Sequence, residues 1–298
     1  MTSHTNAVAG PGLGGRTRRR LAGLTTLALG LSLGVPASAP AAERMYALGS
    51  GNSLLSFRSD DPGEARVRRI TGLPSGEVLV GLDRRPASGQ IYAQGIRNRT
   101  YILSPSTGRA TAVGPGPFAP ALSGTSFGFD FNPMVDRIRL VSNAEQNLRL
   151  NQLTGTVAAV DGNLAYAPGD PGAPTNPASA GTVPSVASSA YTNSRAGAIP
   201  STQLFGIDSA RDTLVLQNPP NDGVLRTVGS LGVNAVEPVS FDIAASGVAY
   251  TAFRVSGQRG VQLYRISLGN GRVRRETRES TIGARGRIRG LTAVGRAR

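Results

Sequence analysis

The sequence contains no cysteine, lysine or tryptophan, and its only histidine is His4. Without cysteine the chain can form no disulfide, thiolate metal site or cysteine nucleophile. Removal of a leader that includes His4 would leave no histidine either. These absences exclude Ser-His-Asp catalysis, histidine-ligated zinc, the P-loop lysine and Schiff-base chemistry. The groups left for chemistry are Asp, Glu, Tyr, Ser, Thr and Arg side chains and backbone amides.

Negative charge is also scarce, because 32 basic residues, all of them arginine, face 18 acidic ones and give a formal net charge of +14. Four of the arginines lie in the predicted leader, and subtracting them leaves +10. Exclusive use of arginine fits a GC-rich coding sequence or a surface attracted to acidic polymers. No basic helix, zinc finger or aromatic RNA-binding motif accompanies the charge, so the sequence predicts no nucleic-acid partner.

Residues 1–41 are typical of a signal peptide. Four arginines (positions 16, 18, 19 and 20) precede the apolar run LAGLTTLALGLSLGV and the small-residue sequence PASAPAAE. The apolar run is shorter than the roughly 20 residues of a membrane-spanning helix, although a membrane anchor is the alternative. We therefore expect export by the general or the twin-arginine route. Residues 42–298 are then predicted to form a single secreted or periplasmic domain, monomeric and without a transmembrane segment.

A pattern of about fifty residues recurs along the rest of the chain, at 78–114, 126–162, 185–232 and 237–279. In the first copy the segments VLVGLD, QIYAQG, TYILSP and RATAVG are rich in strand-forming residues and are separated by turn sequences. Each copy therefore predicts four short strands. Residues 167–184, rich in Pro, Gly and Ala, predict a surface loop between the second and third copies.

The two ends of this region each carry part of a further unit. Residues 45–70 match strands two to four of the repeat, and residues 288–295 match strand one. A ring in which the last strand completes the first sheet explains both incomplete ends and removes exposed sheet edges. The sequence therefore predicts an all-β, five-bladed β-propeller-like ring of four-stranded antiparallel blades, closed by the C-terminal strand. The alternative is an irregular β-sandwich or two-sheet fold.

Alignment of the copies brings one polar position into register near the end of each first strand, occupied by Asp83, Asp130, Thr192, Asp242 and Thr292. Strand alternation would direct these side chains to one face, so the ring would gather three carboxylates at a mouth of its channel. Such carboxylates can act on a glycosidic bond or hold a hard cation such as calcium. Alternatively, each Asp caps the turn that follows it.

The second copy is the richest in polar side chains, which share faces of two neighbouring antiparallel strands. An Asp–Arg–Asn network there could bind a hydroxyl-rich or carboxylate ligand, or could be purely structural. The Arg-rich end, residues 272–298, predicts a basic patch or a solvated edge strand. The candidate binding residues are Asp83, Asp130, Asn132, Asp136, Arg137, Arg139, Asn147, Arg149 and Asp242. No catalytic residue and no metal-ligand set is assigned. The Asp130-x-Asn132 turn does not match a calcium-binding EF-hand loop, because it lacks the central glycine and the terminal glutamate.

Several motifs agree in order with a known family. They include GLDRRPASGQIYAQG, FGFDFNPMVDRIRLVS, DGNLAYAPGD and LFGIDSARDTLVLQNPPNDGVLRTVGSLGV. Together they resemble the bacterial domain of unknown function 4394 over about residues 45–295. The resemblance implies an exported, propeller-like protein. It implies no activity, so no catalytic residue is carried over.

Two classes of function remain. Five near-equivalent units and no nucleophile with an attached base favour a non-enzymatic binding or cell-surface module. Its ligand would be a glycan, an anionic envelope polymer or another protein. The alternative is a carboxylate-dependent, glycan-active hydrolase or lyase that uses Asp83, Asp130 and Asp242.

Overall fold

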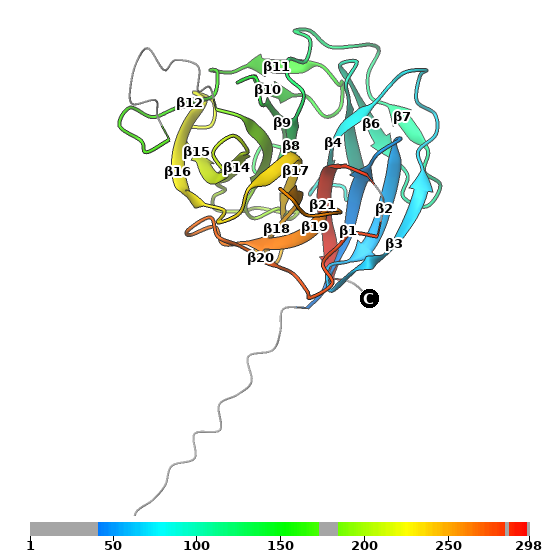
Figure 1. Cartoon of the computed structure of the whole chain (residues 1–298). Helices are drawn as coiled ribbons and strands as arrows, with labels where there is room; N and C mark the ends of the chain where they lie inside the picture. The colour runs from blue at the N-terminus through cyan, green and yellow to red at the C-terminus, as the bar shows by residue number, and fades with distance from the viewer. Residues whose placement is uncertain (1–40, 173–183, 284–285, 297–298) are drawn as a thin grey trace, which may run out of the picture. The chain divides into compact units, whose positions relative to one another are not determined.

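The computed structural model describes residues 41–172, 184–283 and 286–296. The predicted leader, except for Ala41, and most of the predicted 167–184 loop lie outside these residues. Every regular element in the described ranges is a β-strand (Figure 1). Within them, the structure contains no helix of the length and apolar character needed to span a membrane.

The strands form five small sheets, which we number as blades 1 to 5. Blade 1 contains β21 (Ile288–Arg296), β1 (Glu43–Gly49), β2 (Ser53–Arg58) and β3 (Asp61–Arg69). Blade 2 contains β4 (Leu79–Arg84), β5 (Ile91–Gly95), β6 (Arg99–Leu103) and β7 (Ala110–Ala112). Blade 3 contains β8 (Phe127–Asn132), β9 (Arg137–Ser142), β10 (Asn147–Leu150) and β11 (Val157–Val160).

Blade 4 contains β13 (Val186–Tyr191), β14 (Leu204–Asp208), β15 (Thr213–Gln217) and β16 (Val224–Ser230). Blade 5 contains β17 (Ala235–Ile243), β18 (Ala249–Val255), β19 (Gln262–Ile266) and β20 (Val273–Arg275). Neighbouring strands within these four-stranded units are antiparallel. A further strand, β12 (Ala165–Tyr166), pairs with β16 in parallel. Sequence reasoning misses this strand, because the residues around it have the composition of a turn.

The C-terminal strand closes the ring, as predicted. In β21, Ala293 lies opposite Met45 and Leu291 lies opposite Ala47, in an antiparallel pairing with β1. Blade 1 is therefore built from both ends of the described chain (Figure 1). The five-bladed architecture is confirmed, and the β-sandwich alternative is wrong.

The inner strands of the blades contact one another around the axis in the order β21, β4, β8, β13, β17 and back to β21. Glycine makes this close approach possible. A Cβ atom at Gly128 would lie 2.5 Å from the amide nitrogen of Ser189, and one at Gly290 would lie 2.8 Å from that of Leu82. Real side chains do not tolerate such distances, so a residue without a side chain is needed at both positions.

The core is divided into apolar clusters that lie between neighbouring blades. Phe205, Phe241 and Phe253, for example, pack between blades 4 and 5. The cluster between blades 3 and 4 is the smallest, with Val141, Leu164, Val186, Val215 and Leu225 as its buried members. Burial of these side chains between sheets is the main force that holds the blades together.

Deletion of β21 should abolish cooperative folding, because it removes the inner strand of blade 1 together with buried Ile288 and Leu291. We expect a protein truncated after Arg287 to show no cooperative thermal transition by circular dichroism. A control that lacks only residues 297–298 should melt like the full chain. A truncated protein with a wild-type transition would contradict closure.

Substitution of Gly128 by Ala should lower the free energy of unfolding by roughly 1 to 3 kcal/mol, because the new methyl group meets a backbone atom that must move. Gly269 is the matched control, since a Cβ atom added there would meet no other atom within 4 Å. G269A should change stability by no more than about 0.5 kcal/mol. Urea unfolding measures both, and equal effects would show that the inner strands are not in tight contact.

Candidate functional site

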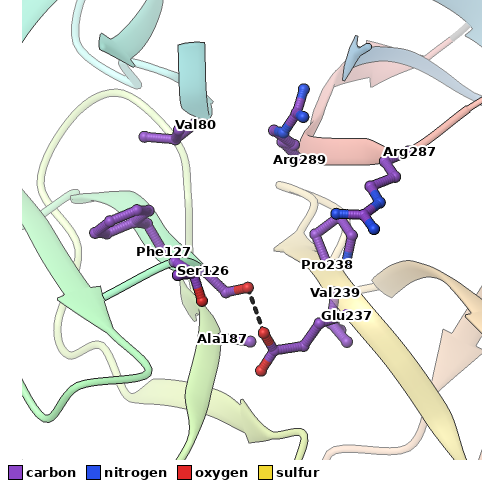
Figure 2. Close-up of a pocket in the computed structure, with 10 residues that line it drawn as sticks. Val80, Ser126, Phe127, Ala187, Glu237, Pro238, Val239, Arg287 and Arg289 are labelled. Atoms are coloured by element: carbon purple, nitrogen blue, oxygen red, sulfur yellow. Dashed lines mark hydrogen bonds between the residues drawn. The ribbon is translucent and has the colours of Figure 1, made fainter. Parts of the chain in front are cut away.

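A pocket lies where the inner strands begin, and we call it the mouth pocket. It has a volume of about 100 Å³. Its lining residues come from segments that lead into or begin the inner strands of all five blades (Figure 2): Val80, Thr125, Ser126, Phe127, Ala187, Glu237, Pro238, Val239, Arg287 and Arg289. The pocket is therefore a product of ring assembly rather than of one blade.

One wall of the mouth pocket is cationic. Arg287 and Arg289 lie across it from Val80 and Phe127 (Figure 2). The Arg287 amide donates to Ser50 Oγ at 3.0 Å, which fixes the backbone of this wall. Arg287 is exposed and Arg289 is half-buried. Neither guanidinium has a hydrogen bond or an ion pair within the described ranges.

The pKa of Arg289 is lowered, first because burial disfavours its charged form and second because the Arg287 charge repels it. Two neighbouring cations thus line a partly desolvated space, and neither forms an ion pair with a described residue. This arrangement is suited to an anionic ligand.

Glu237 also lines the mouth pocket, and its carboxylate points toward Ser126 (Figure 2). Its carboxylate accepts hydrogen bonds from Ser126 Oγ at 2.6 Å, Ser185 Oγ at 3.0 Å and Asn143 Nδ2 at 3.3 Å, and from Ser209 Oγ. These four donors occupy the roughly four acceptor positions of a carboxylate. Glu237 lies in the part of β17 where the pairing with β18 shifts register, between Val236 and Ser240.

Beneath the mouth pocket the axis is nearly filled. The space there is only about 10 Å³, and its walls include Leu82, Phe129, Phe241 and Leu291. That is about the volume at which a cavity first holds one water molecule, roughly 10–15 Å³. The mouth pocket is therefore blind, and a ligand in it does not reach the residues farther down the axis.

One residue farther along the inner strands, Asp83, Asp130 and Asp242 come together, as the repeat alignment predicted. Each offers a carboxylate oxygen, and these oxygens lie within 4.8 Å of one another. Their exposed fractions are 2%, 3% and 2%. We call these three residues the axial carboxylates.

Each axial carboxylate accepts a hydrogen bond from the backbone of the next blade in the ring. The three bonds are Phe131 N to Asp83 Oδ2 at 2.8 Å, Tyr191 N to Asp130 Oδ1 at 2.9 Å and Ala293 N to Asp242 Oδ2 at 2.6 Å. The acids therefore join blades to one another, a role that neither the channel-mouth nor the turn-cap interpretation anticipated. Two of the acids also bind the amide that follows them in sequence: Asp83 accepts from Arg84 N at 2.6 Å, and Asp242 accepts from the Ile243 amide.

Thr292 continues this belt of contacts. Its hydroxyl donates to Asp83 Oδ1 at 2.9 Å and accepts from the Arg84 amide at 3.2 Å. In blade 4 the predicted polar residue, Thr192, is not at the equivalent position. The amide bound by Asp130 belongs to Tyr191, so Ala190 occupies it. A register shift between Val186 and Ser188 in β13 accompanies this offset, which the alignment did not anticipate.

Burial raises the pKa of all three axial carboxylates. For Asp83 the next cause is repulsion by Asp242, and for Asp130 it is repulsion by Asp83. Both pKa values lie well above 3.8, and that of Asp242 is raised to about 6. Clustered carboxylate oxygens are also the ligands that a hard cation prefers, so these three are the residues that could hold one.

Three other predicted site residues lie in or beside turns of blade 3 and do not converge on Asp130. Asn132 accepts a hydrogen bond from the Met134 amide at 2.9 Å. Asp136 binds Arg85 of blade 2 and Gln152 Nε2, the latter at 2.8 Å, and the Arg85 guanidinium lowers the pKa of Asp136. The Arg137 guanidinium donates to Gln152 Oε1 at 3.0 Å.

Arg139, Asn147 and Arg149 gather around Asp161, a residue that the sequence alone places in a turn. Arg139 is 2% exposed and donates to Asp161 at 2.6 Å, while Arg149 binds the same carboxylate through two bonds of 2.8 and 2.9 Å. Arg139 also donates to Asn147 at 2.6 Å and to Asn221 of blade 4 at 2.8 Å. The network thus spans blades 3 and 4, and its role in ligand binding stays a prediction.

Sequence reasoning missed the mouth pocket. Glu237, Arg287 and Arg289 were not among the candidate residues. Arg287 and Arg289 did fall in the Arg-rich end that predicts a basic patch. What the sequence did not reveal is that these arginines lie where the ring closes.

Replacement of Asp242 by Asn should flatten the pH dependence of stability. A pKa of about 6 in the folded state, against 3.8, means that the folded state binds the proton more tightly. Wild-type stability should therefore fall as the pH rises from about 4 to about 6, and stay lower above it. Asn keeps an oxygen for the Ala293 amide but cannot ionise.

The check is a series of thermal melts between pH 4 and 8, with D222N as the control because Asp222 is exposed. D222N should follow the wild-type slope. A D242N protein with that same slope would contradict the raised pKa. Melts repeated with calcium test the calcium prediction, which requires a rise in the wild-type midpoint that D242N lacks.

A family model described as "Domain of unknown function (DUF4394)" matches residues 53–292. A solved protein of unknown function from Bacteroides thetaiotaomicron VPI-5482 is 15% identical, with a TM-score of 0.50 over 87% of this chain and 66% of that one. This likeness supports the fold alone.

Two weaker similarities have functional descriptions. An auxiliary nutrient binding protein from Bacteroides thetaiotaomicron VPI-5482 is 12% identical, with a TM-score of 0.39 over 69% of this chain and 55% of that one. A GH43 glycoside hydrolase, engineered for endo-xylanase and exo-arabinofuranosidase activity, is 13% identical, with a TM-score of 0.45 over 83% and 53%. No curated protein matches the sequence.

Proposed function

We propose that this chain, which belongs to the DUF4394 family, is a binding protein that holds a small, hydroxyl-bearing organic anion, such as a sugar acid, in the mouth pocket. The observation that carries the proposal is the pair of arginines, Arg287 and Arg289, which line the pocket without a partner in the described residues. Because residues 1–41 are typical of a signal peptide, binding would take place outside the cytoplasm.

The other walls define the ligand further. The Arg287 and Arg289 guanidiniums would receive a carboxylate through charge-assisted hydrogen bonds. Ser126 Oγ donates its proton to Glu237, so toward the pocket it can act only as an acceptor, which suits a ligand hydroxyl.

The size of the pocket sets a limit on the ligand. Its volume of about 100 Å³ is below the roughly 300–1,000 Å³ of pockets that enclose drug-sized molecules. A single acidic sugar, or the acidic end of a larger ligand, is therefore the scale that it would accommodate. Phe127 and Val80 would contact the apolar face of that group.

The placement of the acids supports binding over hydrolysis. Glu237 is the one carboxylate in the lining, and its acceptor positions are filled. The axial carboxylates are buried and bind the backbone of neighbouring blades. A glycosidase instead needs two carboxyl groups about 5–10 Å apart on either side of an accessible glycosidic bond.

Isothermal titration calorimetry with D-glucuronate tests the proposal. We expect the wild-type protein to bind glucuronate and not glucose. The R287Q/R289Q double variant should bind at least about tenfold more weakly, because a hydrogen bond to a charged group contributes about 1.5–3 kcal/mol. R274Q removes one positive charge at an exposed position in β20 and should retain wild-type affinity.

Equal affinity of wild type and the double variant would contradict the proposed site, as would equal binding of glucose. The hydrolase alternative has its own test on a panel of polysaccharides. Turnover by the wild type that disappears in D130N would favour the enzyme, since Asn retains an acceptor for the Tyr191 amide.

A further inference from the structure

We infer a second binding site, separate from the mouth pocket, in which a groove between blades 1 and 2 binds an extended acidic polysaccharide through Arg44, Tyr46 and Arg84. The groove lies toward the opposite end of the inner strands, because Arg84 ends β4 whereas Val80, near its start, lines the mouth pocket. We call it the side groove. It does not depend on the ligand proposed for the mouth pocket.

The sequence of blade 1 explains why the two sheets part here. Leu48 of β1 and Leu54 of β2 lie opposite each other and pack against the Leu79 and Leu82 side chains of blade 2. Two residues away on the same face of β1 is Tyr46, and two farther is Arg44. The apolar contact therefore gives way to a larger, polar surface, and the space between the blades opens.

The side groove is long rather than compact. It consists of two hollows of about 510 and 540 Å³, and Arg44 and Tyr46 line both. The first hollow extends to Arg84, Ile91 and Pro105 of blade 2. The second extends along β2 and β3 to Arg66. A ligand that fills both must be an extended chain that crosses Tyr46.

The positive charges of the groove are unbalanced in the hollow that extends to blade 2. The guanidiniums of Arg44, Arg66 and Arg84 have no hydrogen bond or ion pair within residues 41–172, 184–283 and 286–296. No carboxylate lines the blade 2 hollow. In the other hollow Asp61 and Glu64 of β3 lie among the arginines, and Arg58 is paired with Asp60 at 2.8 Å. The positive charge is thus concentrated around Tyr46.

This combination of groups favours a polymer of uronic acids. The half-buried Tyr46 ring, with Ile91, Pro105 and Val294 beside it, offers an apolar surface to the face of a sugar ring. Guanidiniums on both sides can each bind a carboxylate through two parallel bonds. The net charge of +10 that remains without the leader would attract such a polyanion from a distance.

Affinity gel electrophoresis or calorimetry with polygalacturonate in about 150 mM salt tests the inference, since this salt screens diffuse charge. We expect wild type to bind polygalacturonate but not dextran. R44Q/R84Q and Y46A should each weaken binding about tenfold or more. R274Q should bind like wild type. R44Q/R84Q should still bind glucuronate with wild-type affinity, which separates this site from the mouth pocket. Circular dichroism verifies that each variant is folded, and R44Q/R84Q carries the test if Y46A is not.

Three outcomes would overturn the inference. The first is wild-type affinity in a folded R44Q/R84Q protein. The second is a loss in R274Q as large as that in R44Q/R84Q, which would indicate nonspecific charge attraction. The third is duplex DNA that binds with the same affinity and the same sensitivity to these variants, which would indicate recognition of a polyanion without regard to sugar acids.

Discussion

The backbone pairing of β1 with β21 is the interaction on which the rest of the structure depends. It completes blade 1 and positions residues of both candidate sites. Arg287 and Arg289 lie at the start of β21, and Arg44 and Tyr46 lie on β1, with Tyr46 opposite Thr292. The cationic wall of the mouth pocket and the aromatic surface of the side groove are therefore held by opposite ends of the same pair of strands. Closure of the ring and formation of the sites are one event.

The axial carboxylates illustrate a compromise inside the closed ring. Desolvation of three nearby acids is unfavourable when they are ionised, as their raised pKa values reflect. Their hydrogen bonds to amides of neighbouring inner strands, however, satisfy backbone groups that the ring would otherwise bury without partners. The acids thus lose their hydration, but their hydrogen bonds fix the alignment of adjacent blades. This structural role accounts for the recurrence of Asp at the position.

Much of the fold could be predicted because its signals are local and repeated. Strand-forming segments and turn residues marked the four complete units, and the incomplete ends at 45–70 and 288–295 required closure. The convergence of Asp83, Asp130 and Asp242 followed from the same alignment. The role of these acids did not, because their partners are amides of other blades, about fifty or more residues away in the sequence.

The mouth pocket was beyond sequence reasoning for a related reason. Glu237 is held by side chains of blades 3 and 4, and the arginines facing the pocket come from the strand that closes the ring. No local pattern encodes such a meeting. The offset at Ala190 was hidden as well, since the register shift in β13 leaves no clear mark in the residues themselves.

The seam between blades 3 and 4 differs in kind from the others. Its apolar cluster is small, and the buried Arg139 crosses it with hydrogen bonds to Asp161 and Asn147 of blade 3 and to the exposed Asn221 of blade 4. The attraction within a buried ion pair is largely offset by the hydration that both charges lose, whereas apolar packing has no such penalty. Water that enters this seam would form hydrogen bonds with the charged groups. We therefore expect the ring to open first between blades 3 and 4, whereas the β1–β21 pairing that joins the two chain ends within blade 1 stays intact.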